Sequence, residues 1–362
     1  MMNRHTKKST WVILWIITVV IVLLFFSPNI VEQYYTNGLY PLIAKLQRFV
    51  LGWIPFSVGD VFYGLVIFIL LKKLIQLFKK GKRGFTQKGL FYCCKKILFI
   101  TLWIFVLFYG FWGLNYSRVG IAGQLGLNDD KFSVNDLDTL VLLLHTKLNT
   151  KAEQLKPGMR DEYRSHKALF KGAKAAYDIV GKKYHFLEYK PVSLKPSMFS
   201  YLGNYLGFQG YYNPFSGEAQ VNTTIPVCVE PFVTTHEIAH QLGYAKESEA
   251  NFVGYLACKE NPSVVYTYSV YFDMYHYAIR ELYYQDSINA AAYDSTLHTQ
   301  VKKDIEAYRD FYKRYKNPIE PVISQLYGYF LKANRQPKGR EAYNDVVTWL
   351  IAFYKKYGKE NI

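Results

Sequence analysis

Three long apolar runs near the N-terminus constrain the fold of this chain more than any other feature of its sequence. They lie near residues 11–27, 61–78 and 97–113, and in the stretch Trp11–Phe26 the only polar side chain is Thr18. Each run approaches the roughly 17 to 25 residues with which an α-helix crosses the hydrocarbon core of a bilayer. The sequence therefore predicts three transmembrane helices.

The residues around the first run favour an uncleaved anchor over a signal peptide. Basic residues precede the run, as in a signal peptide, but the following sequence SPNIVEQ lacks the small residues of a cleavage site. The second run ends with Lys72 and Lys73, whose long side chains can reach the membrane interface. The alternative, a buried hydrophobic helix pair in a soluble protein, is disfavoured by the number of runs and by their flanking lysines.

The distribution of basic residues predicts the orientation of these helices. The N-terminal tail carries three Lys or Arg residues and the segment 72–96 carries nine, whereas the loop between the first two runs carries only Lys45 and Arg48. By the positive-inside rule the tail and the second loop are cytoplasmic. We therefore expect a multi-pass protein of the cytoplasmic membrane, with a membrane region over 1–113 and an extracytoplasmic domain over 114–362.

The net charge of +16 raises the question of a nucleic-acid partner. Residues 1–113 carry 14 basic against 2 acidic residues, a net of +12, while residues 114–362 carry 30 against 26, a net of +4. The positive charge thus accompanies the apolar runs, and the nearly balanced remainder offers no basic face. The expected partner is a lipid bilayer and not a nucleic acid.

The region after residue 114 is predicted to be mostly helical around a small sheet. Short β-prone runs broken by Gly and Pro occupy residues 184–227, and Glu218–Thr224 alternates as a half-exposed strand would. Apolar periodicity predicts helices on both sides of this region, over 136–148, 161–180, 232–242, 247–258, 262–284, 297–315, 321–333 and 341–357. The expected fold class is α+β, with three N-terminal transmembrane helices followed by a mostly helical domain that contains a small β-sheet.

The stretch THEIAHQLGYAKESEANF, residues 235–252, carries the strongest chemical signal. His236 and His240 are four residues apart, so on a helix they project from one face and can bind one metal ion. Glu237 can reach a water on that ion and take its proton as the water attacks a carbonyl group. Chance occurrence on an amphipathic helix is the alternative, but Gly243 supplies a helix stop before a new helix, as such a site needs.

A catalytic zinc site usually has three protein ligands, so a third ligand must follow the two histidines. A third histidine in the metzincin pattern would stand at position 246, where the chain has Lys246. Two glutamates remain. Glu247 shares a helix face with Asn251, whereas Glu249 points about 200° away from Glu247 around the helix, so only one of the two glutamates can face the histidines.

The motif E-S-E-A-N resembles the E-x-x-A-D signature that supplies the third zinc ligand in membrane-associated gluzincin peptidases. The run from NPFSGEAQVN through PFVTTHEIAHQLGYAKESEANF is also similar to an uncharacterised family of bacterial multi-pass membrane proteins grouped with the zincin peptidases. This resemblance implies a zinc-dependent peptidase fold. It implies His236, His240 and Glu247 as the zinc ligands, and Glu237 as the general base.

The chain departs from the gluzincin signature in two ways. Asn251 stands where the signature has Asp and brings no negative charge to a ligand histidine. The interval between the second histidine and Glu247 is short, which keeps Glu249 as an alternative third ligand.

A peptidase also needs a hydrogen-bond donor for the oxyanion and a strand edge that aligns an extended peptide. Glu218–Thr224, just before the metal helix, is the expected edge. Spacing cannot select the donor among Tyr211, Tyr212, His276, Arg280 and Tyr343.

Other residues that could carry chemistry have simpler interpretations. The aromatic stripe Tyr266–Tyr284 is expected to lie in the core or on the membrane interface. Asp60 is interpreted as a carboxylate at a helix N-terminus. Cys228 and Cys258 could form a disulfide in an extracytoplasmic domain, and no cysteine spacing resembles a zinc site.

The sequence therefore predicts a membrane-anchored zinc metallopeptidase that cleaves a peptide or protein substrate with a zinc-activated water and Glu237 as general base. The alternative is a zinc-stabilised, non-catalytic binding or assembly module of the cell envelope. A transporter or channel is disfavoured, because spans with almost no polar side chains offer no pathway.

Overall fold

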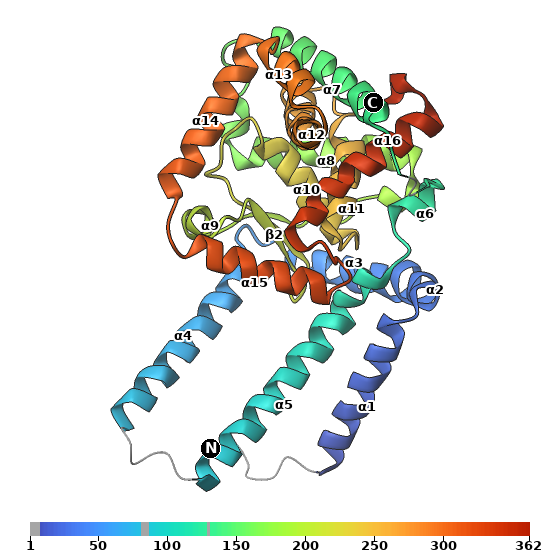
Figure 1. Ribbon diagram of the computed structural model, residues 1–362. Helices are drawn as coiled ribbons and strands as arrows, with labels where there is room; N and C mark the ends of the chain where they lie inside the picture. The colour runs from blue at the N-terminus through green and yellow to red at the C-terminus, as the bar shows by residue number, and fades with distance from the viewer. Residues whose placement is uncertain (1–7, 81–86, 129–130) are drawn as a thin grey trace.

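The computed structural model describes residues 8–80, 87–128 and 131–362 and is mostly helical, with a small three-stranded mixed sheet. Three long apolar helices project from one end of a globular part (Figure 1). They are α1 (Lys8–Phe25), α4 (Val58–Lys80) and α5 (Gln87–Phe111). The basic residues Arg4 and Lys7, which helped to predict the orientation, lie outside the described residues.

Within the described part of the chain, two helices are long and apolar enough to cross a membrane, Lys8–Phe25 and Gly89–Phe111. They coincide with the first and third predicted spans. The second predicted span forms a helix, α4, but α4 is not among these two. Helix α1 packs along α5, whereas α4 stands apart from both (Figure 1).

The chain between α1 and α4 folds back under the globular part. It forms α2 (Pro28–Ile30), a π-helical segment η1 (Val31–Leu39) and α3 (Tyr40–Leu51). Tyr40 and neighbouring apolar residues build a small second core with Trp112 and Tyr116, which follow α5. The segment between the first two helices is thus packed into the globular part and is not a free loop.

The first helices of the globular part follow their sequence signals. After η3 (Gly113–Ser117) and α6 (Ile121–Leu125), a capping box of Ser133 and Asp136 starts α7 (Val134–Gln154). The short turn η4 (Glu162–Arg164) precedes α8 (His166–Lys183), and η5 (His185–Leu187) ends this region. The helices predicted over 136–148 and 161–180 are therefore confirmed, although α7 is longer and α8 begins later than expected.

The sheet differs from the prediction in which strand lies at its edge. Its order is β1 (Leu194–Pro196), β3 (Glu218–Val221), β2 (Gly210–Asn213), with β3 parallel to β1 and antiparallel to β2. The predicted half-exposed strand Glu218–Thr224 is wrong in its exposure, because the strand ends at Val221 and all four residues of β3 are buried between two neighbours. Strand β2 forms the edge. Helix α9 (Ser200–Leu206) separates β1 from β2.

The C-terminal half is a succession of helices. They are α10 (Glu230–Gln241), α11 (Glu247–Cys258), α12 (Val264–Gln285), α13 (Ser287–Ser295), α14 (Thr299–Tyr315), α15 (Glu320–Ala333), η6 (Gly339–Asp345), α16 (Val346–Tyr357) and η7 (Lys359–Asn361). All were predicted except α13 and the two short segments η6 and η7. The predicted helix over 341–357 is divided, since its first turn belongs to η6.

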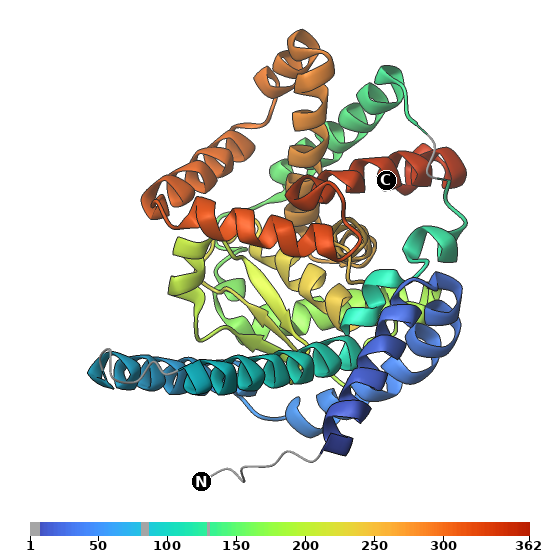
Figure 2. The same ribbon diagram turned by 60° about the horizontal axis from the view of Figure 1, so that its bottom comes forward.

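Helix α12 runs through the centre of the core, where it packs against α7, α10 and α13. Its tyrosines Tyr266, Tyr268 and Tyr275 are fully buried, which confirms the core interpretation of the aromatic stripe. Cys228 and Cys258 are both buried and free, so the disulfide considered from the sequence is not formed. Figure 2 shows the sheet between the apolar helices α4 and α5 and the helices of the core.

Candidate metal centre

Helix α10 carries the two histidines and is enclosed on all sides. Pro231 lies in its first turn, where a missing N–H costs nothing, and all twelve of its residues are buried. The helix ends at Gly243, whose φ of +86° is left-handed, as predicted. A Cβ at this position would also lie 2.8 Å from the Tyr40 ring. Gly243 is therefore required both by the turn and by the close approach of α3.

Helix α11 brings the glutamate to the histidines because the two helices pack closely. At Gly254 a Cβ would lie 3.1 Å from the backbone of His236, so any larger residue would push the two helices apart by a few tenths of an ångström. The Thr235 hydroxyl also donates to the Gly254 carbonyl at 3.3 Å. This contact fixes the start of α11, and with it Glu247, opposite the histidine face of α10.

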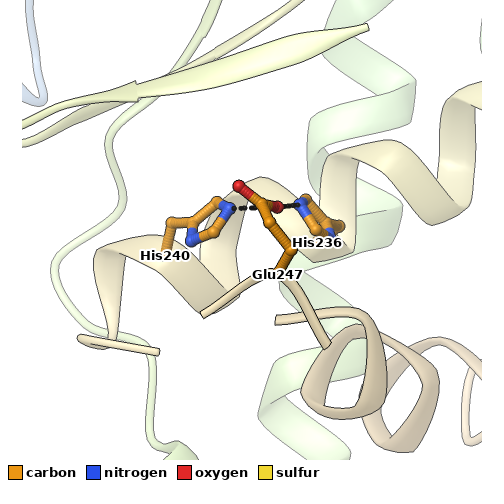
Figure 3. Close-up of side chains that lie close together, drawn as sticks. All are labelled: His236, His240 and Glu247. Atoms are coloured by element: carbon orange, nitrogen blue, oxygen red, sulfur yellow. Dashed lines mark ion pairs between the residues drawn. The ribbon is translucent and has the colours of Figure 1, made fainter. Parts of the chain in front are cut away.

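His236, His240 and Glu247 form a compact buried group (Figure 3). The Glu247 Oε2 atom lies 3.4 Å from Nε2 of His236 and 3.4 Å from Nε2 of His240. The three ligand atoms lie within 4.8 Å of one another, and the group could hold a metal ion. Two imidazole nitrogens and one carboxylate oxygen are a donor set that zinc prefers.

The negative charge of Glu247 would be stabilised by a cation within this group. Burial opposes ionisation of Glu247, but His240 and His236 outweigh it and hold the pKa of Glu247 below its usual value. Burial opposes protonation of His240 as well, yet Glu247 raises the pKa of His240 to about 9. A proton on His240 thus balances the carboxylate where no metal does, and a metal ion would displace that proton.

Groups around the trio orient its members. His240 Nδ1 lies 2.7 Å from the Tyr244 carbonyl, which leaves Nε2 directed at Glu247. The Tyr327 hydroxyl of α15 donates to Glu247 Oε1 at 2.5 Å. The Glu247 backbone N–H donates to Gln336 Oε1 at 3.0 Å. Two of the three ligands are therefore held by hydrogen bonds from outside the group.

The third ligand, His236, lacks such a bond. Its Nδ1 atom has no hydrogen-bond partner among the described residues. Asn251 lies close enough to act on the pKa of His236, but its amide donates to the Tyr343 carbonyl at 3.4 Å instead.

Glu237 lies beside the trio and is not part of it. The residue is 4% exposed, and its Oε2 atom has no hydrogen-bond partner in the described structure. A Cβ at Gly210 of the edge strand β2 would lie 2.5 Å from Glu237 Oε1, so glycine makes room for the carboxylate between helix and strand. Burial raises the pKa of Glu237 to about 8. An unpartnered buried carboxylate next to a metal group and a strand edge is a candidate general base.

Glu249, the alternative ligand, lies apart from the histidines. It is 3% exposed and pairs with Lys246 at 3.1 Å. A Cβ at Gly120 would lie 2.1 Å from its Oε1 atom. Glu249 is buried because the loop before α6 covers the start of α11. Its carboxylate does not belong to the metal-binding group.

The trio and Glu237 line one large cavity of about 1910 Å³ between α10, α12, α14, α15 and the edge strand. All five residues considered as oxyanion donors also line it. Three are engaged elsewhere: Tyr211 donates to Asp60, Arg280 to Asn344, and His276 Nδ1 lies 2.8 Å from the Phe272 carbonyl. These contacts leave Tyr212 and Tyr343 as the candidate donors for the oxyanion.

Of the remaining two candidates, Tyr343 lies closest to the trio. Burial and then the Glu247 carboxylate raise its pKa well above the usual value, so its hydroxyl keeps its proton. Tyr212 is buried beside Tyr40, and its ring centre lies 5.2 Å from that of Trp112. Sequence reasoning missed Tyr327, because nothing in a chain with 33 tyrosines distinguishes a residue that folding brings from α15 to Glu247.

Comparison with known proteins gives a family but no relative of known structure or activity. A family model described as a protein of unknown function, DUF3810, matches residues 35–351. The matched range contains α3, α4, α5 and every residue of the metal centre. No curated protein and no solved structure matches the chain.

Proposed function

The chain belongs to the DUF3810 family, and we propose that it is a membrane-anchored zinc metallopeptidase whose globular part lies outside the cytoplasmic membrane. The observation that carries the proposal is the buried trio His236, His240 and Glu247 with the unpartnered carboxylate of Glu237 beside it in one cavity. A structural zinc site has four protein ligands that complete its coordination, and it needs no general base. A catalytic site has three protein ligands and an open position.

The ligand set and its surroundings fit zinc. Zinc bound by the trio would supply Lewis-acid activation of a water molecule and of a substrate carbonyl. The Tyr244 carbonyl orients His240, and the Tyr327 hydroxyl occupies the second oxygen of Glu247. Partners of this kind hold metal ligands in position and tune their basicity.

Residues of the chain supply proton transfer, oxyanion stabilisation and substrate alignment. Glu237 takes the proton from the attacking water and returns it to the leaving amine. Tyr343, with its hydroxyl beside the trio, donates a hydrogen bond to the oxygen that gains charge during attack. The edge strand β2 binds an extended segment of the substrate as an additional strand, through backbone hydrogen bonds. Gly210 on this strand lies against Glu237.

We propose that α1, α4 and α5 all cross the bilayer. Helix α4 exposes large apolar side chains such as Leu65, Phe68 and Leu71. The three helices run from the globular part to one common level (Figure 1), with successive helices in opposite directions. The end of α4 and the start of α5 lie at that far level, and the chain from 72 to 96 carries nine basic residues, so we place that level on the cytoplasmic side.

A pair of matched substitutions on α10 tests the proposal. Glu237→Gln removes the base and leaves the trio intact, so hydrolysis of a peptide library should be lost while zinc stays bound. Glu230→Gln, seven residues earlier on the same helix, is the control: Glu230 is equally buried but does not line the cavity. It should retain activity.

The same experiment separates the proposal from its alternative. Wild-type protein that binds zinc stoichiometrically but cleaves no peptide, either free or inserted in liposomes, would establish a zinc-stabilised binding or assembly module. Equal activity of Glu237→Gln and Glu230→Gln would remove Glu237 from the reaction.

A further inference from the structure

We infer that the globular part makes a second contact with the bilayer, through a lipid-facing platform on α3, α9 and α15. The platform is defined by six exposed apolar side chains, Phe49, Trp53, Tyr201, Leu202, Leu326 and Tyr329. The inference goes beyond the peptidase chemistry and is independent of it. It rests only on the part of the proposed function that places α1 and α5 in a membrane.

Helix α15 is tied to the ends of the two apolar helices. The Tyr109 hydroxyl, near the end of α5, donates to Asn334 Oδ1 at 2.8 Å. The guanidinium of Arg335, just after α15, lies 5.2 Å from the ring centre of Phe25, the last residue of α1. The end of α15 therefore lies beside the upper end of α5 (Figure 1). The helix therefore lies at the level where the apolar helices leave the bilayer.

One face of α15 is apolar and uncovered. Val322, Leu326 and Tyr329 are 54%, 58% and 57% exposed, and their spacing of four and three residues places them on one face. Phe330, next to this face, meets the ring of Phe108 on α5 at 6.0 Å. The apolar face thus continues from the contact with α5 and points to the membrane side of the globular part.

Helix α3 presents a second face of the same kind. Leu46 and Phe49 are three residues apart on α3 and strongly exposed, and Trp53, two residues beyond the end of the helix, is exposed as well. On the opposite face, buried Arg48 donates to the Gln241 carbonyl at 3.1 Å, which holds α3 against the end of α10. Since α3 belongs to the connection between α1 and α4, it cannot lie far from the bilayer. Trp53 is of the residue type that membrane interfaces favour.

Helix α9 completes the platform beside α4. Tyr201 is 71% exposed, and Leu202 is exposed beside it. Just before the helix, the Met198 backbone N–H donates to Asp60 Oδ2 at 2.8 Å. Asp60 lies in the first turn of α4. Each of the three platform helices is therefore fastened to the end of an apolar helix.

The chemistry of the platform fits a lipid surface. Three amphipathic segments with exposed Trp, Tyr, Phe and Leu at one level have the composition of interfacial helices, which bury an apolar face at the boundary of headgroups and acyl chains. A patch of this size facing water would be an aggregation hazard. Helix α15 bears the platform on one face and Tyr327 on another, so contact with lipid also steadies the hydroxyl that binds Glu247.

Nitroxide labelling of the full chain in liposomes tests the inference. A background of Cys93→Ser and Cys94→Ser removes the exposed thiols, and buried Cys228 and Cys258 resist the reagent. Labels at Leu326→Cys and Phe49→Cys report on the platform. A label at Ile104→Cys reports on α5, and one at Ile288→Cys on α13 at the opposite end of the molecule, where Ile288 is 85% exposed.

The two platform labels should be accessible to oxygen and lose accessibility to a water-soluble nickel complex, as the Ile104→Cys label should. The Ile288→Cys label should show the reverse. Platform labels that match Ile288→Cys, while Ile104→Cys is lipid-embedded, would overturn the inference. Labels inaccessible to both oxygen and nickel would also overturn it, in favour of a protein partner. A water-exposed label at Ile104→Cys would instead overturn the membrane placement. Two platform labels guard against one variant failing to fold.

Discussion

Helices α10 and α1 differ from the helices of a soluble protein in opposite ways: α10 buries ionisable side chains, and α1 exposes apolar ones. All twelve residues of α10 are buried, although they include two histidines and two glutamates. Of the eighteen residues of α1, nearly all apolar, only Leu14 and Ile21 are buried. In a soluble protein charged groups are seldom fully buried without partners, and large apolar surfaces are seldom left uncovered.

Each reversal therefore indicates a component other than protein. Buried ionisable groups are stable when a counter-charge neutralises them, and a cation between His236, His240 and Glu247 would do so. Exposed apolar helices are stable when lipid covers them. The metal centre and the apolar helices are thus two sites where the sequence fits an environment that the polypeptide alone does not provide.

At the metal centre, removal of a zinc ligand should have the largest effect on zinc binding and on activity. His240→Ala should abolish zinc binding and lower kcat/KM by about a thousandfold or more, because a catalytic metal contributes several kcal/mol to the transition state. Metal analysis and a peptide cleavage assay measure the two effects. His276→Ala, which removes another histidine of the same cavity, should leave zinc binding unchanged; equal zinc loss in both variants would contradict the assignment.

The next effect should come from the oxyanion donor. Tyr343→Phe removes a hydroxyl beside Glu247 without opening a cavity, and kcat should fall by about a hundredfold with little change in KM, as for loss of one oxyanion donor. Tyr312→Phe removes a hydroxyl that accepts from Gln209 in the same cavity and serves as the control. Equal rates for the two variants would exclude Tyr343 as the donor.

On the lipid side, a charge placed in α5 should oppose insertion. Ile104 is 54% exposed near the middle of the helix, and Ile104→Lys should disfavour insertion by about 3 kcal/mol. The fraction of protein that resists alkaline extraction from membranes measures this. Ile288→Lys, at an isoleucine on α13 that is still more exposed, should behave as wild type. Normal membrane retention of Ile104→Lys would count against α5 as a span.

Asn251→Asp should produce the smallest effect and act in the opposite direction. The substitution places a carboxylate beside His236, whose Nδ1 atom has no hydrogen-bond partner among the described residues, and should tighten zinc binding by about tenfold or less. Competition with a chelator of known affinity measures the change. Asn344→Asp adds the same charge elsewhere in the cavity and should leave zinc affinity unaltered.

Local patterns in the sequence predicted much of the fold and the core of the site. Helix periodicity located α7, α8, α10 to α12 and α14 to α16 but missed α9, and the spacing of His236 and His240 predicted a shared metal-binding face that the structure brings together with Glu247. These features depend on neighbours within a few residues, so the order of side chains along the chain determines them.

Features that depend on distant segments were not predictable. The burial of Glu249 comes from the loop before α6, and the hydrogen bond from Tyr327 comes from a helix 80 residues further on. The choice of β2 over β3 as the edge strand depends on pairing with β1. The apolar run of α4 was correctly predicted as a helix, although α4 is not among the two described helices that are long and apolar enough to cross a membrane.

Zinc analysis of three purified proteins tests the metal centre most directly: wild type, Glu247→Ala and Glu249→Ala. The two variants remove buried glutamates two residues apart on α11, of which only Glu247 faces the histidines. We predict stoichiometric zinc in wild type and in Glu249→Ala, and none in Glu247→Ala, with all three proteins folded. Wild-type protein without zinc, or zinc lost from Glu249→Ala and retained by Glu247→Ala, would contradict the account.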